Sequence, residues 1–525
     1  MAKAKTSGGV MQIEIPAPLE GVNLTSSVDK LKGTEAAQLR GFEFDEYGVI
    51  GVPRAPRDLG VIAAGTKVLS AGVFDRGTLD PILYVHLSDG SIRYSQDWIN
   101  TTGTATWATL VTGQGTAPAA FVQFLSAMWI SVYNVNLHKV TSSLVLTSYP
   151  GSPKGYSMAV WKDTMWQANI PGAPDKVMSC APGDPTNWPA LNYTEIGKGE
   201  EGTGIIGIWP TETALAVFKR NRTHILHDPV EFTNRLLDPD KGLLKRDSMV
   251  VHNGRMYFTS EQGVCRYLGD GPSAIISQKL GPLFNDAAGT KYGTSLATRV
   301  YSAHAGGGSA YSFNDHIGFH IPTTISSPYT KYWPDLPETP WMFGVPASEP
   351  TGGPNQRFVR FVVFRHLRDA GDGSLTYDPE ELYEISGDPA KLYRHYDAPA
   401  STAAVTSEWD TSWQDFDDPL SEKWLSMLQV LHRGPIDVFV RSDYDRDLSI
   451  PVATALNHGE PELQESTIYC DVYGRSFQIS IRGATAGELK QQLPSGSSAI
   501  GEISRFQAGV ASIACTAQKL SAYRR

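Results

Sequence analysis

The chain has 525 residues, 41% of them hydrophobic, so it can bury substantial cores and is not a disordered tail. Only 19% of the residues are charged, while 50 glycines, 34 prolines, 22 tyrosines, 19 phenylalanines and 12 tryptophans favour strands and turns over a long helical protein. The formal charge is −10, and no basic tract stands out beyond Lys219-Arg220 and Lys245-Arg246, which disfavours tight binding to duplex DNA.

Cysteine use and apolar runs indicate the compartment. The four cysteines (Cys180, Cys265, Cys470 and Cys515) are scattered and show no spacing typical of zinc sites. Lys3 and Lys5 precede no apolar core, so no signal peptide is expected. The densest apolar run, 358–364, is interrupted by Arg360 and is too short to cross a bilayer. We therefore expect a protein made in a reducing compartment, without a membrane segment.

Pairs of half-apolar runs separated by short turns recur along the chain and predict antiparallel meanders. The runs and their turns are Ile82–Leu87 and Ile92–Ser95 around Asp89-Gly90; Met158–Trp161 and Thr164–Ala168 around Lys162-Asp163; Ile205–Trp209, Thr213–Phe218 and Thr223–Leu226; Ser248–His252, Arg255–Thr259 and Val264–Leu268, with a type I′ turn at Asn253-Gly254; and Ala310–Phe313 and Ile317–Ile321 around Asn314-Asp315.

Local meanders over hundreds of residues predict an all-β fold, a β-propeller-like stack with inserted loops or small β subdomains. The pattern does not fix the number of blades, and a stack of sandwiches remains open. Two windows are expected to be helical, Ser421–His432, whose Trp424, Leu425, Leu428 and Leu431 share a helical face, and Pro379–Ile385.

Composition divides the chain into five expected segments. Proline density marks an insertion, and a polar Ser- and Gly-rich stretch, Gly483–Gly501, precedes a last strand near Val510–Ala514. A further loop is expected at Asp369–Ser374. The segments are an N-terminal segment with the first strands (1–60), propeller blades (61–321), the proline-rich insertion (322–354), further blades and a short helix (355–482), and the polar loop with a closing strand (483–525). We expect the N- and C-terminal strands to pair in one blade.

Two motifs resemble ligand sites but fit them poorly. The run 197–202 matches G-x-G-x-x-G, yet Glu200 and Glu201 stand where phosphate would approach, and the residues that follow are strand-like, which indicates an acidic turn. Asp443, Asp445 and Asp447 resemble a calcium loop, but Leu448 replaces the glycine that such a loop needs, and a solvated strand end fits better. We predict no metal site and no cofactor.

Catalytic patterns are also weak. The twelve histidines include no H-E-x-x-H, and Ser309 lacks the second glycine of a nucleophile elbow. A pair of carboxylates acting on sugars is not excluded by composition. The tryptophans are expected to fill blades and interfaces rather than to stack sugars; they are Trp98, Trp107, Trp129, Trp161, Trp166, Trp188, Trp209, Trp333, Trp341, Trp409, Trp413 and Trp424. The sequence predicts no enzyme and no catalytic residue.

Several blocks resemble one family. At the N-terminus these are Gly21–Leu24, Leu31–Ala36, Phe42–Gly48 and Gly51–Arg54; later blocks are Asp184–Trp188 with Gly204–Ile208 and Leu215–Lys219, Ser248–Phe258 with Gly263-Val264 and Gly269–Gly271, and Trp413–Pro419 with Lys423. Together they resemble the β-propeller proteins of bacteriophage tails, especially the tail nozzle (tail tube) proteins of short-tailed phages. The family's Gly…Arg-Pro-Gly close reads Gly51-Val52-Pro53-Arg54-Ala55-Pro56 here.

The resemblance implies a structural protein of the virion tail, synthesised in the host cytoplasm. It would form a ring, expected to be a hexamer, that serves as a nozzle or tail-tube end for genome ejection and as a platform for fibres. Its partners would be copies of itself, a tail adaptor or portal-proximal protein, tail fibre or spike proteins, and DNA in passage without specific binding. Six chains of charge −10 would carry about sixty negative charges, which repel phosphates. The insertion Pro322–Pro354, with Trp333 and Trp341, and the loop Gly483–Gly501 are the expected contacts outside the propeller core.

Two other functions stay open. A carbohydrate-binding, receptor-recognising or glycan-degrading propeller at a tail tip is the alternative, motivated by the Trp-containing stretch Thr330–Phe343. A cellular scaffold propeller is a third reading, which the absence of a regular sequence repeat makes less favoured.

Overall fold

The computed structural model of the chain divides into two compact units. One unit comprises 1–57, 330–346 and 395–525, and we call it the terminal unit; the other comprises 58–329 and 347–394, and we call it the propeller unit. The structure describes residues 5–519 except 8–9, 27–29, 45–48, 54–55, 102, 200–203, 229–230, 268–270, 285–289, 292–293, 296–307, 322–328, 345–359, 370–373, 388–389, 397–406, 444–450, 457–462 and 484–505.

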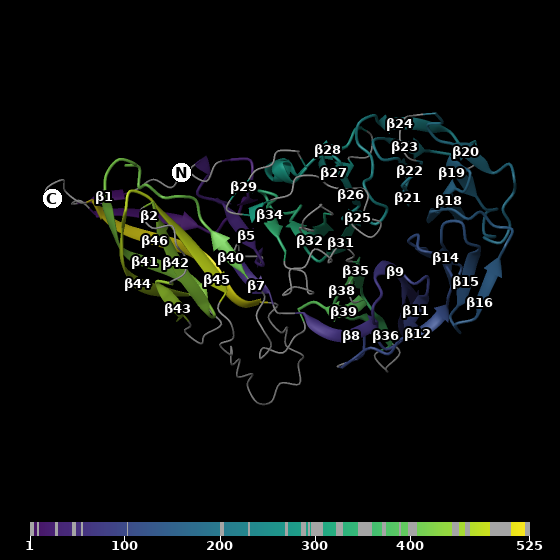
Figure 1. Ribbon diagram of the computed structural model, residues 1–525, viewed down its shortest axis with the longest axis horizontal. Helices are drawn as coiled ribbons and strands as arrows, with labels where there is room; N and C mark the ends of the chain where they lie inside the picture. The colour runs from purple at the N-terminus through teal and green to yellow at the C-terminus, as the bar shows by residue number, and fades with distance from the viewer. Residues whose placement is uncertain are drawn as a thin grey trace. The chain divides into compact units, whose positions relative to one another are not determined.

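In the described part of the propeller unit, six four-stranded sheets and the hairpin of β31 and β32 form the blades (Figure 1), which confirms the all-β, propeller-like expectation. In chain order they are β9 (Val68–Arg76), β10 (Leu79–Leu87), β11 (Ile92–Ser95) and β12 (Ala108–Val111); β13 (Ala120–Phe124), β14 (Ala127–Ser131), β15 (Leu137–Thr141) and β16 (Leu146–Tyr149); β17 (Ser157–Trp161), β18 (Thr164–Ile170), β19 (Ala173–Ser179) and β20 (Tyr193–Glu195); β21 (Gly207–Pro210), β22 (Leu215–Phe218), β23 (Thr223–Leu226) and β24 (Asn234–Asp238); β25 (Met249–His252), β26 (Arg255–Ser260), β27 (Gly263–Tyr267) and β28 (Ala274–Ile275); the hairpin of β31 (Ser309–Phe313) and β32 (His316–His320); and β35 (Arg360–Phe364), β38 (Glu381–Gly387), β39 (Ala390–Arg394) and β8 (Arg57–Ala63).

Apolar side chains shared by neighbouring sheets join these blades. Phe74 on β9 and Met128 on β14 belong to one buried cluster, and Trp166 on β18 and Leu215 on β22 belong to another. The last blade returns to the first, because Val362 on β35 lies in one buried cluster with Val85 on β10. Each blade thus covers the apolar face of the next, which is how a propeller buries its sheets.

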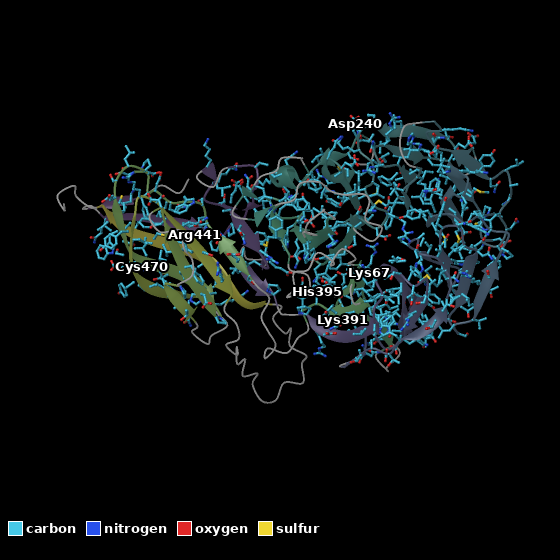
Figure 2. All side chains as sticks on the ribbon, viewed as in Figure 1. Lys67, Asp240, Lys391, His395, Arg441 and Cys470 are labelled. Carbon is cyan, nitrogen blue, oxygen red and sulfur yellow. The ribbon has the colours of Figure 1, made fainter. Side chains whose placement is uncertain are left out.

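A strand from the start of the chain completes the last blade. β8 lies beside β39, on which Lys391 lies (Figure 2). The Nζ atom of Lys391 is 2.8 Å from Asp58 Oδ2 on β8. The pairing of terminal strands that the sequence led us to expect in a blade occurs elsewhere. β2 (Val10–Pro16) runs antiparallel to β46 (Phe506–Lys519) in the terminal unit, so that expectation was wrong about the place.

Tight turns explain the regular spacing of the meanders. Asn253 and Gly254 both have positive φ (48° and 72°), as do Lys162 and Asp163 (49° and 54°), which is the signature of type I′ hairpin turns. The strands flanking these turns pair as predicted, Met249 with Phe258 and Met158 with Gln167. Short polar turns of this kind fix the register and hence the face that each strand buries.

Both predicted helices are strands. The window Ser421–His432 forms β41 (Lys423–Arg433), in which Leu425, Leu428 and Val430 are buried. The register of β41 shifts between Leu425 and Met427, so the buried residues Leu425 and Leu428 are three positions apart instead of two. This spacing resembles that of a helix. The window Pro379–Ile385 overlaps β38, which pairs with β35 and β39 on its two sides.

Among the described residues, two large sheets make up most of the terminal unit. The boundary between the units falls at about residue 395, within the expected segment 355–482. The first has the order β1 (Lys5–Ser7), β2, β46, β41, β44 (Gln464–Gly474), with β7 (Ile50–Pro53) beside β46 and β6 (Glu43–Phe44) beside β7; the second contains β33 (Tyr329–Tyr332), β34 (Trp341–Phe343), β5 (Gln38–Arg40), β40 (Glu408–Asp410), β45 (Phe477–Gly483), β42 (Ile436–Ser442) and β43 (Ala453–Leu456). β33 and β34 come from the proline-rich insertion.

The other described elements are short. They are the parallel pair β3 (Gly21–Val22) and β4 (Glu35–Ala36), the hairpins β29 (Thr290–Lys291) with β30 (Thr294–Ser295) and β36 (Leu367–Asp369) with β37 (Leu375–Tyr377), and the 3₁₀ helix η2 (Gln278–Leu283). Among the described residues, no helix is both long enough and apolar enough to cross a bilayer. Residues 484–501, most of the predicted polar loop, lie outside the description.

Candidate functional site

The inner strands of the propeller unit line a cavity of about 230 Å³. Each of β9, β13, β17, β21, β25, β31 and β35 contributes to it or is preceded by a residue that does. The lining residues are Ala71, Ala119, Ala120, Phe121, Ser157, Met158, Ile208, Trp209, Arg246, Asp247, Met249, Ser309, Ala310, Arg360 and Phe361. We call this space the axial cavity.

Arg246 spans the axial cavity. Its guanidinium donates to the backbone oxygens of Pro118 (3.1 Å), Ala119 (2.6 Å) and Tyr156 (2.8 Å), which lie just before β13 and β17. Its Nε donates to Asp247 Oδ1 at 2.9 Å, and one Nη lies 3.5 Å from Asp247 Oδ2. These contacts employ all five N–H donors of the side chain.

Arg360 approaches the same carboxylate from the first position of β35. Its guanidinium lies 3.2 Å from Asp247 Oδ2 and donates to the backbone oxygens of Leu69 (2.8 Å) and Gly308 (3.2 Å). Burial alone would raise the pKa of Asp247, but the guanidiniums of Arg246 and Arg360 outweigh it and hold that pKa below its usual value. We call Arg246, Asp247 and Arg360 the axial ion network.

The axial ion network connects blades that are not neighbours in the chain. Through backbone oxygens and ion pairs it reaches the starts of β13, β17, β25, β31 and β35, and Leu69 within β9. The adjacent Lys245 is also affected, since burial, with repulsion from Arg360 and Arg220, lowers its pKa to about 8. Buried charges held by many partners fix a geometry strictly.

Sequence reasoning did not identify this network. Arg360 was noted only as the interruption of the apolar run 358–364, and Arg246 only as part of a basic pair. Both observations were usable signals, because a lone arginine inside an apolar strand must find partners when the strand is buried. Which partners it finds depends on residues more than a hundred positions away, such as Pro118 and Leu69.

The N-terminal block of the family resemblance folds as a small polar-centred turn in the terminal unit. Asn23 is buried, donates to Glu35 Oε1 at 3.0 Å, and accepts from the backbone N–H of Thr25 at 2.9 Å. Gly21 has a φ of +72°, and a β-carbon there would stand 2.5 Å from the backbone of Trp341. These residue types are therefore required by packing and hydrogen bonding inside the unit.

The block Asp184–Trp188 closes the loop between β19 and β20. Asp184 Oδ1 accepts from the Thr186 backbone N–H (3.0 Å) and hydroxyl (2.6 Å), and Trp188 Nε1 donates to the Pro185 oxygen at 2.9 Å. The Lys219 that ends a companion block lies 2.9 Å from Asp175 Oδ1, joining the blades of β19 and β22. Both blocks act in the scaffold.

The block Trp413–Lys423 ends in a buried ammonium group. Lys423 has an exposed fraction of 0% and donates to the backbone oxygens of Asp418, Ser421 (3.0 Å) and Arg475 (2.9 Å). Phe416 is buried beside Phe477, with ring centroids 6.2 Å apart. The lysine thus closes a loop over the start of β41.

The two doubtful ligand motifs are turns where they are described. Lys198 forms an ion pair with Glu195 (2.6 Å) in a turn after β20, whereas Glu200 and Glu201 lie outside the description. Asp443, at the end of β42, accepts from the Arg475 backbone N–H at 2.7 Å; Asp445 and Asp447 lie outside it. Among the described residues, no group of three or more His, Cys, Asp or Glu is placed to hold a metal ion.

The tryptophans are mostly interior. Six of them have an exposed fraction of 2% or less: Trp98, Trp129, Trp166, Trp333, Trp341 and Trp409. Trp341 stacks on Tyr332 within the terminal unit (4.6 Å between centroids), and Trp333 meets the edge of Phe44. The expectation that Trp333 and Trp341 anchor other molecules was wrong, because the unit's own core encloses them.

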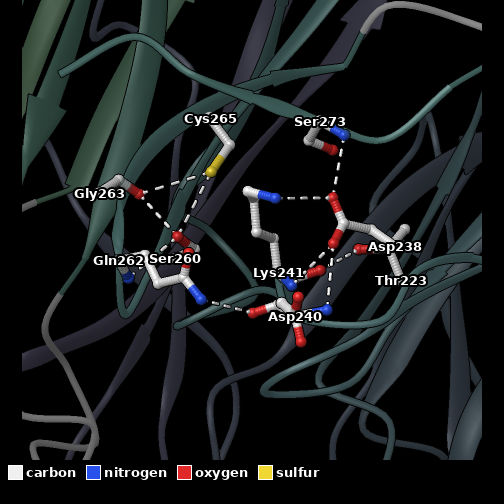
Figure 3. Close-up of polar contacts among 9 residues, drawn as sticks. All are labelled: Thr223, Asp238, Asp240, Lys241, Ser260, Gln262, Gly263, Cys265 and Ser273. Atoms are coloured by element: carbon white, nitrogen blue, oxygen red, sulfur yellow. Dashed lines mark hydrogen bonds and ion pairs between the residues drawn. The ribbon is translucent and has the colours of Figure 1, made fainter. Parts of the chain in front are cut away.

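A further polar cluster lies where the blades of β24 and β27 meet (Figure 3). Asp238 is fully buried; its carboxylate accepts from the backbone N–H groups of Asp240 (3.1 Å), Lys241 (3.0 Å) and Ser273 (2.9 Å). Ser260 Oγ lies 3.3 Å from Cys265 Sγ, and burial raises the pKa of that thiol to about 11. The cluster fastens loops together and leaves the thiol unreactive at neutral pH.

Comparisons with known proteins yield distant structural likenesses. No family model and no curated protein matches the sequence. The structure is similar to virginiamycin B lyase from Staphylococcus aureus (TM-score 0.42, 11% identity, 65% of this chain and 98% of that chain). It is also similar to the extracellular domain of a hybrid two-component system from B. thetaiotaomicron (0.40, 9%, 73% and 44%) and to a chain of a mitotic checkpoint complex (0.38, 9%, 65% and 93%). These TM-scores and sequence identities are too low for the activity of any of these proteins to be assigned to this chain.

Proposed function

We propose that this chain is a structural protein of a phage tail, whose copies form a ring-shaped nozzle or tail-tube end for genome ejection and a platform for fibres. One observation carries the proposal. The polar residues of the blocks that resemble tail nozzle proteins, such as Asn23, Glu35, Asp184 and Lys423, are employed in holding this chain's own loops. The residues that carry the resemblance therefore stabilise the fold of this chain, and a rigid fold is what a subunit of a conduit requires.

The axial cavity is not the conduit. Its volume of about 230 Å³ is smaller than the roughly 300–1,000 Å³ of ordinary small-molecule pockets, and Arg246 crosses it between backbone oxygens of different blades. In the proposed nozzle, the nucleic acid therefore passes through the central channel of a ring of copies and not through the axial cavity of one chain. Heterologous contacts close into such a ring when the rotation between subunits fits.

The terminal unit offers a surface for such contacts. β44 is the last strand of its sheet in the described chain, and its alternate side chains face outward, with Tyr469 82% and Tyr473 49% exposed. An edge strand presents unpaired backbone groups, and exposed tyrosines are common anchors at protein interfaces. We assign this strand, in place of Trp333 and Trp341, as the contact to a neighbouring subunit or tail protein.

Native mass measurement on the purified chain and on reconstituted tails tests the proposal. We expect a closed ring, six-fold as in the resembling family, that the substitution Tyr469→Arg converts to monomers without lowering the melting temperature, because Tyr469 is 82% exposed. Leu191→Arg is the matched control, since Leu191 is 85% exposed in the propeller unit. A chain that stays monomeric in both assays and binds glycans on an array would refute the proposal in favour of a carbohydrate-binding or glycan-degrading propeller.

A further inference from the structure

We infer that a covalent cross-link joins the two large sheets of the terminal unit: an amide bond that Lys331 Nζ and Glu43 Cδ form without an enzyme, with Tyr396 as the catalytic group. This inference does not depend on the proposed function. It follows from where the three side chains meet, how deeply the ion pair is buried and which atoms are in contact.

Lys331 and Glu43 connect the two sheets directly. Glu43 lies on β6, which pairs with β7 in the first sheet, and Lys331 lies on β33, which pairs with β34 in the second. Lys331 Nζ contacts Glu43 Oε1, although the two residues are 288 positions apart in the chain. Beside them Phe44 meets the edge of Trp333, with ring centroids 5.1 Å apart, so apolar packing holds the two strands in place.

Both members of this pair are removed from water. The Lys331 side chain is 6% exposed and that of Glu43 is 0% exposed, whereas in the pair of Lys219 and Asp175 the carboxylate side is 26% exposed. Buried charges are costly, and one proton transfer from the ammonium to the carboxylate removes both. The site therefore makes a neutral amine and a neutral carboxylic acid accessible, which are the forms that condense to an amide.

Tyr396 touches both reacting groups. Its hydroxyl donates to the same Glu43 Oε1 and accepts from Lys331 Nζ at 3.3 Å. A hydroxyl placed in this way can take a proton from the nitrogen and give its own to the oxygen. The backbone of Tyr396 has a φ of +59°, an uncommon conformation for a residue with a β-carbon and one that clusters at functional sites.

The condensation needs no other reactant. After a proton has moved from the ammonium to Oε1, the Nζ lone pair attacks Cδ. The proton that the nitrogen must then lose passes to Tyr396, which gives its hydroxyl proton to Oε1, and the Cδ–Oε1 bond breaks to release water. One ammonium and one carboxylate become one amide and one water molecule. Groups held in contact within one molecule react as if present at about 10⁵–10⁸ M, and a buried site excludes the water that would reverse the step.

Intact-mass measurement on the denatured full chain, followed by peptide mapping, tests the inference. We expect the wild type to be lighter than its sequence by one water molecule, with Lys331 and Glu43 in one branched peptide. Lys331→Arg keeps the positive charge but lacks the amine, so it should have the full mass. Tyr396→Phe should form the bond about a hundredfold more slowly, so freshly purified protein should contain unjoined chains whose fraction falls with time.

Two other ion pairs serve as controls in the same digest. Lys219 with Asp175 (2.9 Å) and Lys391 with Asp58 (2.8 Å) are close but partly exposed, and their peptides should stay separate. The inference is overturned if the wild type has the full mass, or if the missing water maps to peptides other than those of Lys331 and Glu43. Joined control peptides would refute the argument from burial, and a Tyr396→Phe chain that joins as fast as the wild type would refute the role of Tyr396. Because the mass is read on denatured chains, a variant that does not fold leaves the wild-type result decisive.

Discussion

Replacing Arg246 by methionine should destabilise the propeller unit more than any change at its surface. The substitution removes the donors to Pro118, Ala119 and Tyr156 and leaves the Asp247 carboxylate, whose side chain is 29% exposed, with Arg360 as its remaining partner in the axial ion network. Breaking a buried ion pair from one side costs about 3–5 kcal/mol. Each backbone oxygen left without a donor would cost about 1–3 kcal/mol in a dry site, but water entering the cavity supplies donors in place of the guanidinium, so the ion-pair cost dominates.

We therefore expect a loss of about 4 kcal/mol, which for a unit of this size lowers the melting temperature by roughly 8–16 °C. Differential scanning calorimetry of the full chain measures it, because the transition of the propeller unit can be followed beside that of the terminal unit. The terminal unit's transition should not move.

Arg255→Met is the control, since Arg255 is exposed on β26 and its substitution should change stability by less than about 0.5 kcal/mol. A double-mutant cycle with Asp247→Asn should show the two losses to be strongly non-additive, because the side chains are in direct contact. If the Arg246→Met and Arg255→Met variants have the same melting temperature, the axial ion network does not stabilise the propeller unit.

The remaining predictions concern acid, thiols and the N-terminal block. Burial lowers the pKa of His86 from 6.5 to about 4, so between these pH values the unfolded chain binds a proton that the folded chain does not bind. The free energy of unfolding is therefore highest above pH 6.5 and falls by about 3 kcal/mol as the pH is lowered to 4. His86→Gln should remove this fall from a plot of the urea unfolding midpoint against pH. Burial raises the pKa of Cys180 and Cys470 to about 11, so a thiol reagent at pH 7 should label neither until urea unfolds the chain; rapid labelling of the native protein would contradict this. Gly21→Ala should lower the terminal unit's melting temperature through the clash with the Trp341 backbone, and an unchanged value in calorimetry would refute that account.

Local sequence signals predicted the strands of the blades correctly but led us to expect a helix where the chain forms one long strand. Asn253-Gly254 and Lys162-Asp163 identify their hairpins because a two-residue turn with positive φ determines the strands on both sides. The stretch at Ser421–His432 was taken for a helix because a bulge near Met427 breaks the period of two. A bulge depends on the partner strands β44 and β46, which are distant in the sequence.

The sequence by itself determined the class of this protein: all-β, built of meanders, with turns placed by residue chemistry and with tryptophans in the interior. Only the tertiary structure decided which strand closes the last blade, that the ends of the chain pair in a separate unit, and that Arg246, Asp247 and Arg360 meet in one cavity. The physical reason is the range of the interactions. Turn geometry and strand alternation act over a few residues, whereas a buried charge is compensated by whichever groups the closed ring brings to it.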